Sequence, residues 1–360
     1  MPDSLYIHVP FCKSICAYCD FYRGLYNEKT VFSWLKEIRK DFAGINNVET
    51  IYIGGGTPSS LNDEQLDTLL AYCDYLLPVK EFTVEVNPEN ITQAKIDIMK
   101  KHGVNRVSIG IQSFNDDILK SLGRRADLQT NIKALNLLKD NFENISLDLM
   151  YSLPDQSMED WINDLNKAVS FNIPHISFYS LTVEEGSIFY KQHKQPLDNE
   201  TEYLMYKKGI EIMENNSYHQ YEISNFAKDN HESLHNKNYW YYKDFTGIGP
   251  GSSSKVNDKR WTDTTKLKDY IEGKRDKELI DLSKEDILFE AVMMGLRLNE
   301  GIDLQDYKDR FNTDLLEHYS LAVKENLDKK LLVIENNHLK TTEEGRYILH
   351  DVLIPFMEFL

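Results

Sequence analysis

Three cysteines, Cys12, Cys16 and Cys19, stand within eight positions near the start of the chain. They follow a short apolar run at residues 5–9, which we predict to be a strand, so their thiols lie in the loop at its C-terminal end. Thiolates are soft ligands that suit an iron–sulfur cluster or zinc, and a cluster normally takes four of them. With three thiolates, the pattern predicts either a fourth ligand from elsewhere in the chain or an iron left open for a substrate or cofactor.

Zinc is the alternative that the residues leave open. The three thiolates would be joined by the imidazole of His8 or by the distant thiol of Cys73. Cys73 fits this role poorly, because it falls on the apolar face of a predicted helix with Leu66 and Leu70 and is better interpreted as a core residue. His8 alternates within the predicted strand and stays a candidate ligand.

The cysteines follow the first strand in a series of repeated strand–helix units. Short runs rich in β-branched and aromatic residues are each followed by a stretch with helical spacing, which indicates a parallel sheet. We predict strands at residues 5–9, 50–53, 82–86, 106–111, 145–150 and 175–179. Helices are predicted at residues 29–43, 63–77, 92–102, 127–139, 157–171 and 199–215. These units predict an α/β fold with a partial (β/α)6 barrel, in which ligands bind where the strands end.

The last third of the chain follows a different pattern. A seventh strand-like run at residues 218–224 leads into an aromatic- and glycine-rich segment, residues 225–261, which could close or lid the barrel. Helices at residues 284–296, 304–311 and 315–326 and a hairpin of residues 331–335 and 338–341 then predict a small winged-helix-like α+β domain. We therefore predict a barrel over residues 1–225, a closing segment over 226–278 and a C-terminal domain over 279–360.

Composition and charge exclude several classes of function. The formal net charge of −17 argues against a nucleic-acid partner, because such binding needs clustered lysine and arginine. Four cysteines in 360 residues are too few for a disulfide framework and indicate a reducing compartment. Residues 1–9 carry no basic and apolar leader, and no apolar run of about 18 residues occurs. We expect a cytoplasmic protein without a membrane span.

Candidate ligand-binding residues follow the predicted strands. The triple glycine at residues 54–56 comes after the second strand, where it lets the backbone approach a ligand closely and leaves amides free. Glu85, Gln112 and Asp148 fall at or near the C-terminal ends of the next three strands. A barrel places such side chains on one face, so we expect them to meet the cysteines there.

The spacing C-x3-C-x2-C resembles the signature of the radical-SAM superfamily. In that superfamily three cysteines bind three irons of a 4Fe-4S cluster, and the amino and carboxylate groups of S-adenosylmethionine chelate the fourth iron. One electron from the cluster then cleaves the sulfonium to give methionine and a 5'-deoxyadenosyl radical. The cofactor carries the difficult chemistry, while the protein orients it and excludes water.

Over nearly its whole length the sequence is similar to oxygen-independent coproporphyrinogen III oxidase and to its shorter paralogues, the HemW-type haem chaperones. Matching segments stand in order at residues 6–12, 53–59, 85–88, 105–114, 122–124, 148–151, 179–186, 221–226, 235–240 and 294–298. The resemblance implies that Cys12, Cys16 and Cys19 hold the cluster. It implies that S-adenosylmethionine is held by Tyr6, Tyr18, Gly54, Gly55, Gly56, Thr57, Glu85, Gln112, Arg124 and Asp148.

Two departures from the oxidase favour the chaperone branch. The oxidase has a long N-terminal extension and a further cysteine two positions after the third, whereas here eleven residues precede Cys12 and Phe21 takes the extra position. The activity of the chaperone branch is haem binding and transfer, so we expect no decarboxylation of coproporphyrinogen III. A radical-SAM decarboxylase and a zinc-stabilised binding protein remain the alternatives.

Residues 235–240, His-Asn-Lys-Asn-Tyr-Trp, match the motif that is characteristic of the chaperone branch. An imidazole near large aromatic rings suits a haem iron and its macrocycle, so His235 is the expected haem ligand. Relatives commonly have histidines where this chain has Ala126 and Ser253, so its haem handling could differ. The resemblance implies haem, haem-acceptor proteins and an electron donor as partners.

Overall fold

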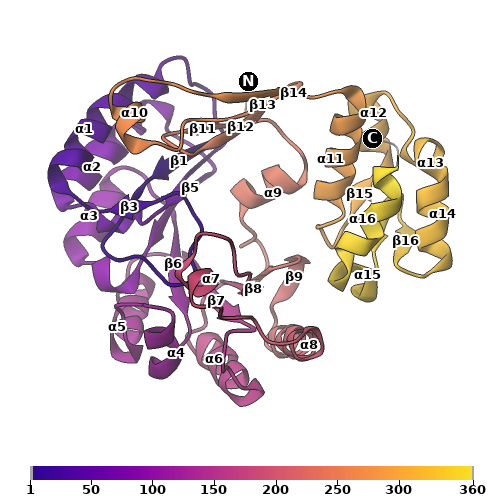
Figure 1. The fold of residues 1–360 in the computed structure, drawn as a ribbon, viewed down its shortest axis with the longest axis horizontal. Helices are drawn as coiled ribbons and strands as arrows, with labels where there is room; N and C mark the ends of the chain where they lie inside the picture. Colours follow the sequence, from indigo (N-terminus) through magenta and orange to yellow (C-terminus); the bar gives the residue numbers. More distant parts are fainter. Residues whose placement is uncertain (1–2, 359–360) are drawn as a thin grey trace.

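Residues 3–358, which the computed structural model describes, are arranged around one large sheet (Figure 1). Within these residues the sheet has 12 strands in the order β14-β13-β12-β11-β1-β4-β5-β6-β7-β8-β10-β9. Its parallel centre consists of β1 (Ser4–Val9), β4 (Thr50–Gly55), β5 (Glu81–Val86), β6 (Arg106–Gln112), β7 (Asn144–Tyr151) and β8 (His175–Ser180). All of the strands predicted for the barrel are confirmed, each within two residues at either end. The predicted outer domain bounds, residues 1 and 360, lie outside the described residues.

Helices that follow the parallel strands cover the outer side of the sheet in an arc (Figure 1). They are α1 (Glu28–Ile38), α2 (Asp63–Ala71), α3 (Gln93–Lys101), α5 (Leu128–Lys139), α6 (Met158–Ser170) and α8 (Asn199–Asn215). The first two are shorter than predicted, because the chain after each tightens into the 3-10 turns η1 (Arg39–Phe42) and η3 (Asp74–Leu76). The alternation of strand and helix confirms the predicted α/β fold.

Side chains along the parallel strands alternate between two environments. Leu5, Ile7 and Val9 of β1 belong to the main hydrophobic core, as do Val107 and Ile109 of β6, and the residues between them are polar or glycine. Successive side chains of a strand point to opposite faces, so the apolar set packs against the helices and the polar set faces inward. The inside of the curved sheet is therefore lined by groups that can meet a ligand.

Antiparallel strands extend the parallel centre on both sides. On one side β10 (Asn225–Ala227) and β9 (His219–Glu222) follow β8, so the strand expected at residues 218–224 lies at the edge of the sheet. On the other side β11 (Phe245–Ile248) pairs in parallel with β1. The sheet continues there through β12 (Ser253–Val256), β13 (Lys259–Thr262) and β14 (Glu278–Asp281). Within residues 3–358 the two outermost strands, β14 and β9, do not pair with each other, which leaves an open sheet.

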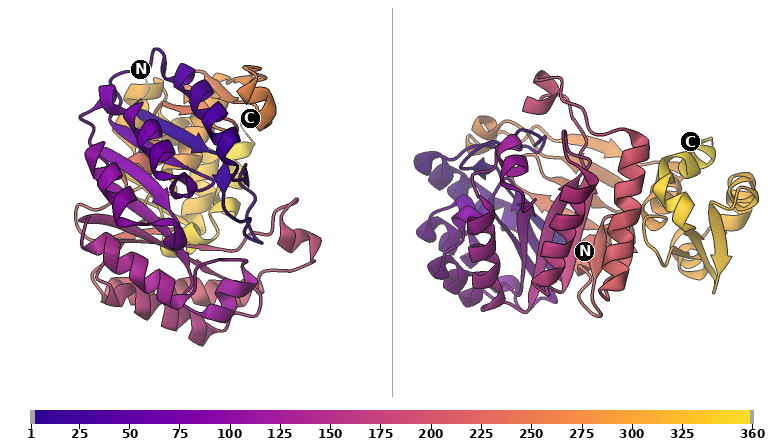
Figure 2. Two further views of the ribbon diagram at one scale, coloured as in Figure 1. Left: turned by 90° about the vertical axis from the view of Figure 1, so that its left-hand side faces the viewer. Right: turned by 90° about the horizontal axis from the view of Figure 1, so that it is seen from below.

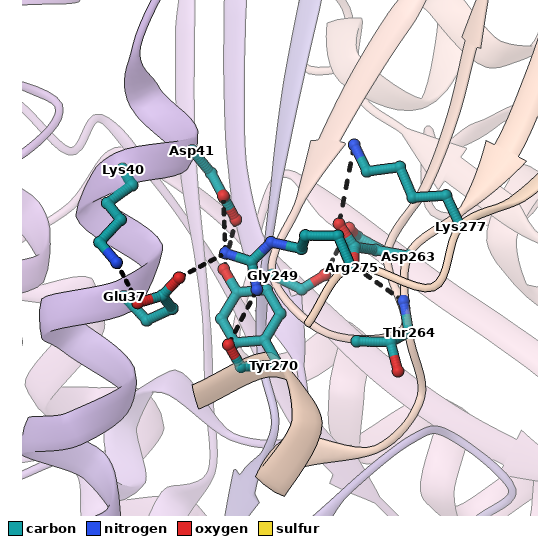
Figure 3. Close-up of polar contacts among 10 residues, drawn as sticks. Glu37, Lys40, Asp41, Gly249, Asp263, Thr264, Tyr270, Arg275 and Lys277 are labelled. Atoms are coloured by element: carbon teal, nitrogen blue, oxygen red, sulfur yellow. Dashed lines mark hydrogen bonds and ion pairs between the residues drawn. The ribbon is translucent and has the colours of Figure 1, made fainter. Parts of the chain in front are cut away.

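A network of polar contacts fastens the segment after β13 to the first helix (Figure 3). Arg275 Nη2 lies 3.3 Å from Glu37 Oε1 and 3.0 Å from Asp41 Oδ1. The hydroxyl of Tyr270, in α10 (Leu267–Ile271), donates to Asp41, and the Arg275 guanidinium lies 3.8 Å from the centre of the Tyr270 ring. This network holds the added strands against the barrel.

The C-terminal part of the chain has its own core and lies to one side of the barrel (Figure 2). Its elements are α11 (Lys284–Gly295), β15 (Ile302–Asp303), α12 (Leu304–Phe311), α13 (Leu315–His318), α14 (Ser320–Asp328), β16 (Leu332–Glu335), β17 (His338–Thr341), α15 (Glu343–Tyr347) and α16 (Leu349–Met357). The helices and the hairpin are confirmed, but the helix predicted at 315–326 is divided at Tyr319. No helix formed by residues 3–358 is long and apolar enough to cross a membrane.

Candidate functional site

The three cysteines lie on a loop that the rest of the barrel holds in place. Cys12 ends the short strand β2 (Phe11–Cys12), which pairs with β3 (Gly24–Leu25) at the other end of the loop. In the middle of the loop, the backbone N–H of Ala17 donates to the carbonyl oxygen of Leu122 at 2.9 Å. The loop is therefore fixed at both ends and at its centre.

Polar groups surround the cysteine sulfurs. Thr57 Oγ1 donates to Cys12 Sγ at 3.4 Å, and Arg124 Nη1 donates to Cys16 Sγ at 3.7 Å. Burial raises the pKa of Cys12 and raises the pKa of Cys19 to about 11, although neighbouring arginines oppose both shifts. These two thiols therefore hold their protons at neutral pH until a metal displaces them.

The cysteines line a cleft at the C-terminal ends of the parallel strands. The structure brings to this cleft eight of the residues expected to bind S-adenosylmethionine: Tyr18, Gly55, Gly56, Thr57, Glu85, Gln112, Arg124 and Asp148. They come from six different parts of the barrel and meet because parallel strands end on the same side. Their role in binding the cofactor stays a prediction.

Among the cleft residues that the sequence analysis missed, two make hydrogen bonds to expected binding residues and end or follow a predicted strand. Asn87 Nδ2 donates to Thr57 Oγ1 at 3.3 Å, and Asn87 Oδ1 accepts from Arg124 Nη2 at 3.2 Å. The Tyr179 hydroxyl donates to Gln112 Oε1 at 3.0 Å. Each of these two residues ends or directly follows a predicted strand, so the rule that found Glu85 could have found them as well.

The triple glycine brings the backbone into the cleft wall, and larger residues would not fit. A Cβ atom on Gly54 would lie 2.8 Å from the Glu85 carboxylate, and one on Gly56 would lie 2.7 Å from the carbonyl oxygen of Val9. Gly55 has a φ of +104°, and a Cβ there would lie 2.5 Å from the His8 ring. The positions therefore require glycine, as expected for a close backbone approach.

Two half-buried carboxylates, Glu85 and Asp148, form the inner wall of the cleft. Glu85 accepts hydrogen bonds from the Tyr52 hydroxyl at 2.7 Å and from the Gly55 amide at 3.2 Å. Asp148 accepts from Ser108 Oγ at 3.1 Å. Burial raises the pKa of Asp148 and raises the pKa of Glu85 to about 7. Carboxylates in such a place are suited to bind ammonium or hydroxyl groups of a ligand.

Arg124 supplies positive charge beside the cysteines. Its Nη2 donates to the carbonyl oxygen of Gly110 at 2.5 Å, which fixes the guanidinium over the end of β6. Its Nε is buried and has no hydrogen-bond partner among residues 3–358. Gln112 lies beside it with a positive φ of 69°. An unpaired buried donor next to three thiols fits a ligand that carries a carboxylate, as S-adenosylmethionine does.

Two expected binding residues, Tyr6 and Gly54, do not line the cleft itself. The Tyr6 hydroxyl is hydrogen-bonded to His8 Nδ1 at 3.1 Å, and its ring stacks against Tyr52 with centroids 6.2 Å apart. Gly54 lies directly against Glu85. Tyr6 and Gly54 therefore pack behind the residues that line the cleft.

The structure gives the zinc alternative no fourth ligand. His8 Nε2 is hydrogen-bonded to the carbonyl oxygen of Tyr22 at 2.7 Å, and its Nδ1 is bonded to Tyr6. Cys73 is fully buried in the main core, which confirms its interpretation as a core residue. Within residues 3–358, no group of three or more Cys, His, Asp or Glu side chains is placed to hold a metal ion. The three thiols that line the cleft match the three cysteine ligands expected for a 4Fe-4S cluster.

His235, the expected haem ligand, is buried in this structure, and its role as a ligand stays a prediction. It belongs to α9 (Leu234–Trp240), is 1% exposed, and its two ring nitrogens are hydrogen-bonded to Thr50 Oγ1 and to the Tyr239 hydroxyl, both at 2.8 Å. Its ring also stacks on Tyr52, with centroids 5.1 Å apart. His235 thus closes the end of the barrel opposite the cysteine cleft, and in this arrangement neither nitrogen is available to iron.

Comparisons with known proteins agree with this geometry. The family model described as the Radical SAM superfamily matches residues 6–168, and the HemN C-terminal domain matches residues 282–348. The fold is similar to that of coproporphyrinogen III oxidase (HemN) from Escherichia coli, with a TM-score of 0.85 and 21% identity over 100% of this chain and 91% of that chain. The fold and the three-cysteine cleft define a radical-SAM protein.

Curated relatives define the particular family. The Heme chaperone HemW of Lactococcus lactis is 32% identical to this chain, covering 99% of it and 97% of the relative. The Heme chaperone HemW of Escherichia coli is 34% identical and covers 99% and 98%. The chain belongs to the HemW family, which confirms the resemblance seen in its motifs. Membership of the radical-SAM class implies a 4Fe-4S cluster and S-adenosylmethionine.

Proposed function

We propose that this chain is a haem chaperone, which binds haem and transfers it to acceptor proteins, and that a 4Fe-4S cluster and S-adenosylmethionine assist it. One observation carries the proposal: nearly the whole chain is similar, at 32% and 34% identity, to proteins named Heme chaperone HemW. A cleft that gathers three cysteines, two carboxylates and an arginine supports the cofactor part of the proposal.

In this proposal the three cysteines ligate three irons, and S-adenosylmethionine binds the fourth. When bound, the cluster and S-adenosylmethionine supply one-electron chemistry at the sulfonium. Arg124, whose buried Nε is unpaired, orients the carboxylate of the ligand. Glu85 and Asp148 accept hydrogen bonds from its amino and hydroxyl groups.

The proposal includes partners and a location. Acceptor proteins receive the haem, and an electron donor reduces the cluster. The net charge of −17 speaks against nucleic acid as a further partner. We place the protein in the cytoplasm, because the four cysteines are free thiols and a reducing compartment keeps them so.

A porphyrinogen decarboxylase is the second candidate, and the fold similarity to HemN favours it. Phe21 argues against this activity. It is 63% exposed beside the cleft, at the position where the oxidase has its further cysteine. A phenyl ring cannot replace a thiol as a ligand or as a proton donor.

Anaerobic reconstitution with iron and sulfide, followed by parallel assays, separates the two functions. We expect wild-type protein to bind haem in an absorbance titration. With reduced cluster and S-adenosylmethionine it should leave coproporphyrinogen III unchanged. Turnover to the vinyl product would refute the chaperone proposal, and a preparation that holds stoichiometric zinc and no sulfide would restore the zinc alternative.

A further inference from the structure

A cavity of about 650 Å³ lies between the barrel and the C-terminal domain. Trp240 and Tyr241, at the end of α9, line it on the barrel side. Tyr307 and Phe311 of α12 and His338 of β17 line it on the other side. Figure 1 shows α9 turned toward these C-terminal elements. The volume and the aromatic lining are those of a site for a large, flat, apolar ligand.

His338 offers an open imidazole nitrogen in this cavity. Its Nδ1 lies 2.9 Å from the carbonyl oxygen of Asn336, which can only accept, so Nδ1 carries the proton. Its Nε2 therefore has a free lone pair and forms no hydrogen bond with residues 3–358, since Asp303 Oδ2 is 4.0 Å away. Metal-binding histidines are commonly held in this way, with one nitrogen donating to a carbonyl group and the other facing the metal.

Aromatic rings form the walls on both sides of the cavity. The rings of Tyr307 and Phe311 contact each other with centroids 4.8 Å apart. Opposite them, Trp240 is held by the guanidinium of Arg297, which lies 4.5 Å from its ring centre. The Trp240 Nε1 is buried and has no hydrogen-bond partner among residues 3–358. This unpaired donor is available to a polar group of a ligand.

Two cations line the same cavity. Lys243 is held only loosely by Asp3, at 3.7 Å. Arg310 donates to the carbonyl oxygen of Tyr241 at 2.8 Å and pairs with Asp306 at 3.2 Å, so it bridges the barrel and the C-terminal domain. The acidic residues that share this cavity are Asp3, Glu300, Asp303 and Asp306. Lys243 and Arg310 are the groups that can pair with carboxylates of an incoming ligand.

We propose that this cavity binds haem, with His338 Nε2 as an iron ligand and with Trp240 and Phe311 as the walls that hold the macrocycle, while the buried Tyr307 ring supports Phe311 from behind. The inference rests on the proposed haem-chaperone function and gives that function a site. In this inference the motif of residues 235–240 has two roles. His235 faces into the barrel and anchors α9, whereas Trp240 faces the cavity.

A second cavity, of about 1100 Å³, contains His219 but suits haem less well. His219 Nε2 is hydrogen-bonded to Glu232 at 3.2 Å, and the aromatic residues of this cavity are Tyr203 and Tyr218. Part of its wall is the charged face of α8, with Lys207, Glu211 and Glu214. It serves as the competing site in the experiment below.

Haem titration of full-length, anaerobically reconstituted protein tests the ligand. His338→Ala should weaken haem binding by roughly ten- to a hundred-fold and shift the Soret band, because an iron ligand is lost. His350→Ala, which removes an exposed histidine of α16 in the same domain, is the matched control, and both it and His219→Ala should match wild type. Wild-type affinity and spectrum in His338→Ala would overturn the inference, as would a loss confined to His219→Ala. Absence of haem binding by wild type would instead refute the proposed function.

Titration with iron-free protoporphyrin distinguishes the loss of an iron ligand from the loss of contacts with the macrocycle. His338→Ala should bind it as wild type does, because no iron is present, whereas Trp240→Ala should weaken both porphyrins. Equal weakening of both porphyrins in His338→Ala would reject His338 as the ligand. Thermal unfolding of each variant, together with retained iron and sulfide content, shows that the protein is folded during the titrations.

Discussion

At the scale of single residues, a connected series of contacts runs along the inside of the sheet, from His235 at one end to the cleft at the other. His235 stacks on Tyr52, and the Tyr52 hydroxyl donates to Glu85 at 2.7 Å. Glu85 in turn accepts from the Gly55 amide in the cleft wall. The motif that marks the chaperone branch is therefore connected to the cleft through Tyr52, which contacts both His235 and Glu85.

We expect the four cysteines to differ in their effect on the cluster, because three of them line the cleft and Cys73 lies in the core. Replacing Cys12, Cys16 or Cys19 with alanine should abolish the iron–sulfur absorption of reconstituted protein, because each removes a ligand. Cys73→Ala should keep the full iron and sulfide content, since Cys73 lies in the hydrophobic core. Loss of the cluster in Cys73→Ala would mean that the site uses four cysteines.

The two carboxylates of the cleft should affect the cofactor and not the cluster. Glu85→Gln and Asp148→Asn should retain iron and sulfide but bind S-adenosylmethionine less tightly. Each lost hydrogen bond to a charged group is worth about 1.5–3 kcal/mol, or roughly ten- to a hundred-fold in affinity. Glu184→Gln, at an exposed carboxylate, is the control for equilibrium dialysis. Unchanged affinity in both cleft variants would show that the cofactor lies elsewhere.

His235 should make the protein sensitive to acid. Burial lowers the pKa of His235 to about 3, so the folded protein keeps it neutral while the unfolded chain takes up a proton below about pH 6.5. Stability is therefore lost as pH falls through that window, by about 1.4 kcal/mol per pH unit. His235→Gln should be less stable than wild type at pH 7.5 but should lose less on going to pH 5.5, as measured by urea unfolding. An identical pH dependence of the two proteins would contradict the buried neutral state.

The residues of the cleft were predictable because their positions follow from strand ends. Glu85, Gln112 and Asp148 each sit where a predicted strand stops, and strand ends of a parallel sheet share one side. The burial of His235 was not predictable in this way. It depends on the contact with Thr50, which forms only when α9 packs against β4, and no local pattern in residues 235–240 indicates that placement.

At the scale of elements, the strands added beside β1 depend on the contacts that Arg275 and Tyr270 make with α1 and the following turn η1. Arg275→Ala removes the ion pairs to Glu37 and Asp41 and should lower the free energy of unfolding by about 1–3 kcal/mol, as expected for hydrogen bonds to charged groups. Lys274→Ala is the control, because Lys274 is an exposed neighbour whose ion pairs, to Asp269 and Glu272, lie within its own segment. Equal urea midpoints for the two variants would show that the network does not stabilise the fold.

Elements with a strong repeating pattern were predicted well, and short ones were not. The parallel strands are continuous apolar–polar alternations and each helix after them has one apolar face, so both signals are local. Strands β12 to β14 have four residues each, and their pairing is set by the hairpin partners. The division of α13 from α14 at Tyr319, where φ is −103° and ψ is 33°, leaves no mark in the hydrophobic spacing.

At the scale of the whole molecule, the C-terminal domain contributes one wall of a cavity and the barrel contributes the other. Arg310 donates to the carbonyl oxygens of Tyr241 and Tyr242, so the two parts are joined beside that cavity. A ligand held there contacts both parts at once. The cysteine cleft, in contrast, is built by the barrel alone.

Because β1 lies between β4 and β11 in the sheet, its two neighbouring strands become available at different times during synthesis. Its first partner, β4, begins at Thr50, but its second, β11, begins at Phe245. At about 5–20 residues per second, the ribosome needs roughly 10–40 seconds to make the chain between these two partners. Throughout that time the strand that leads into the cysteine loop has one open edge, and open edges pair readily with other chains. The late segment around β11 thus protects the earliest strand, and the cysteine loop gains its finished support only when two thirds of the chain has been made.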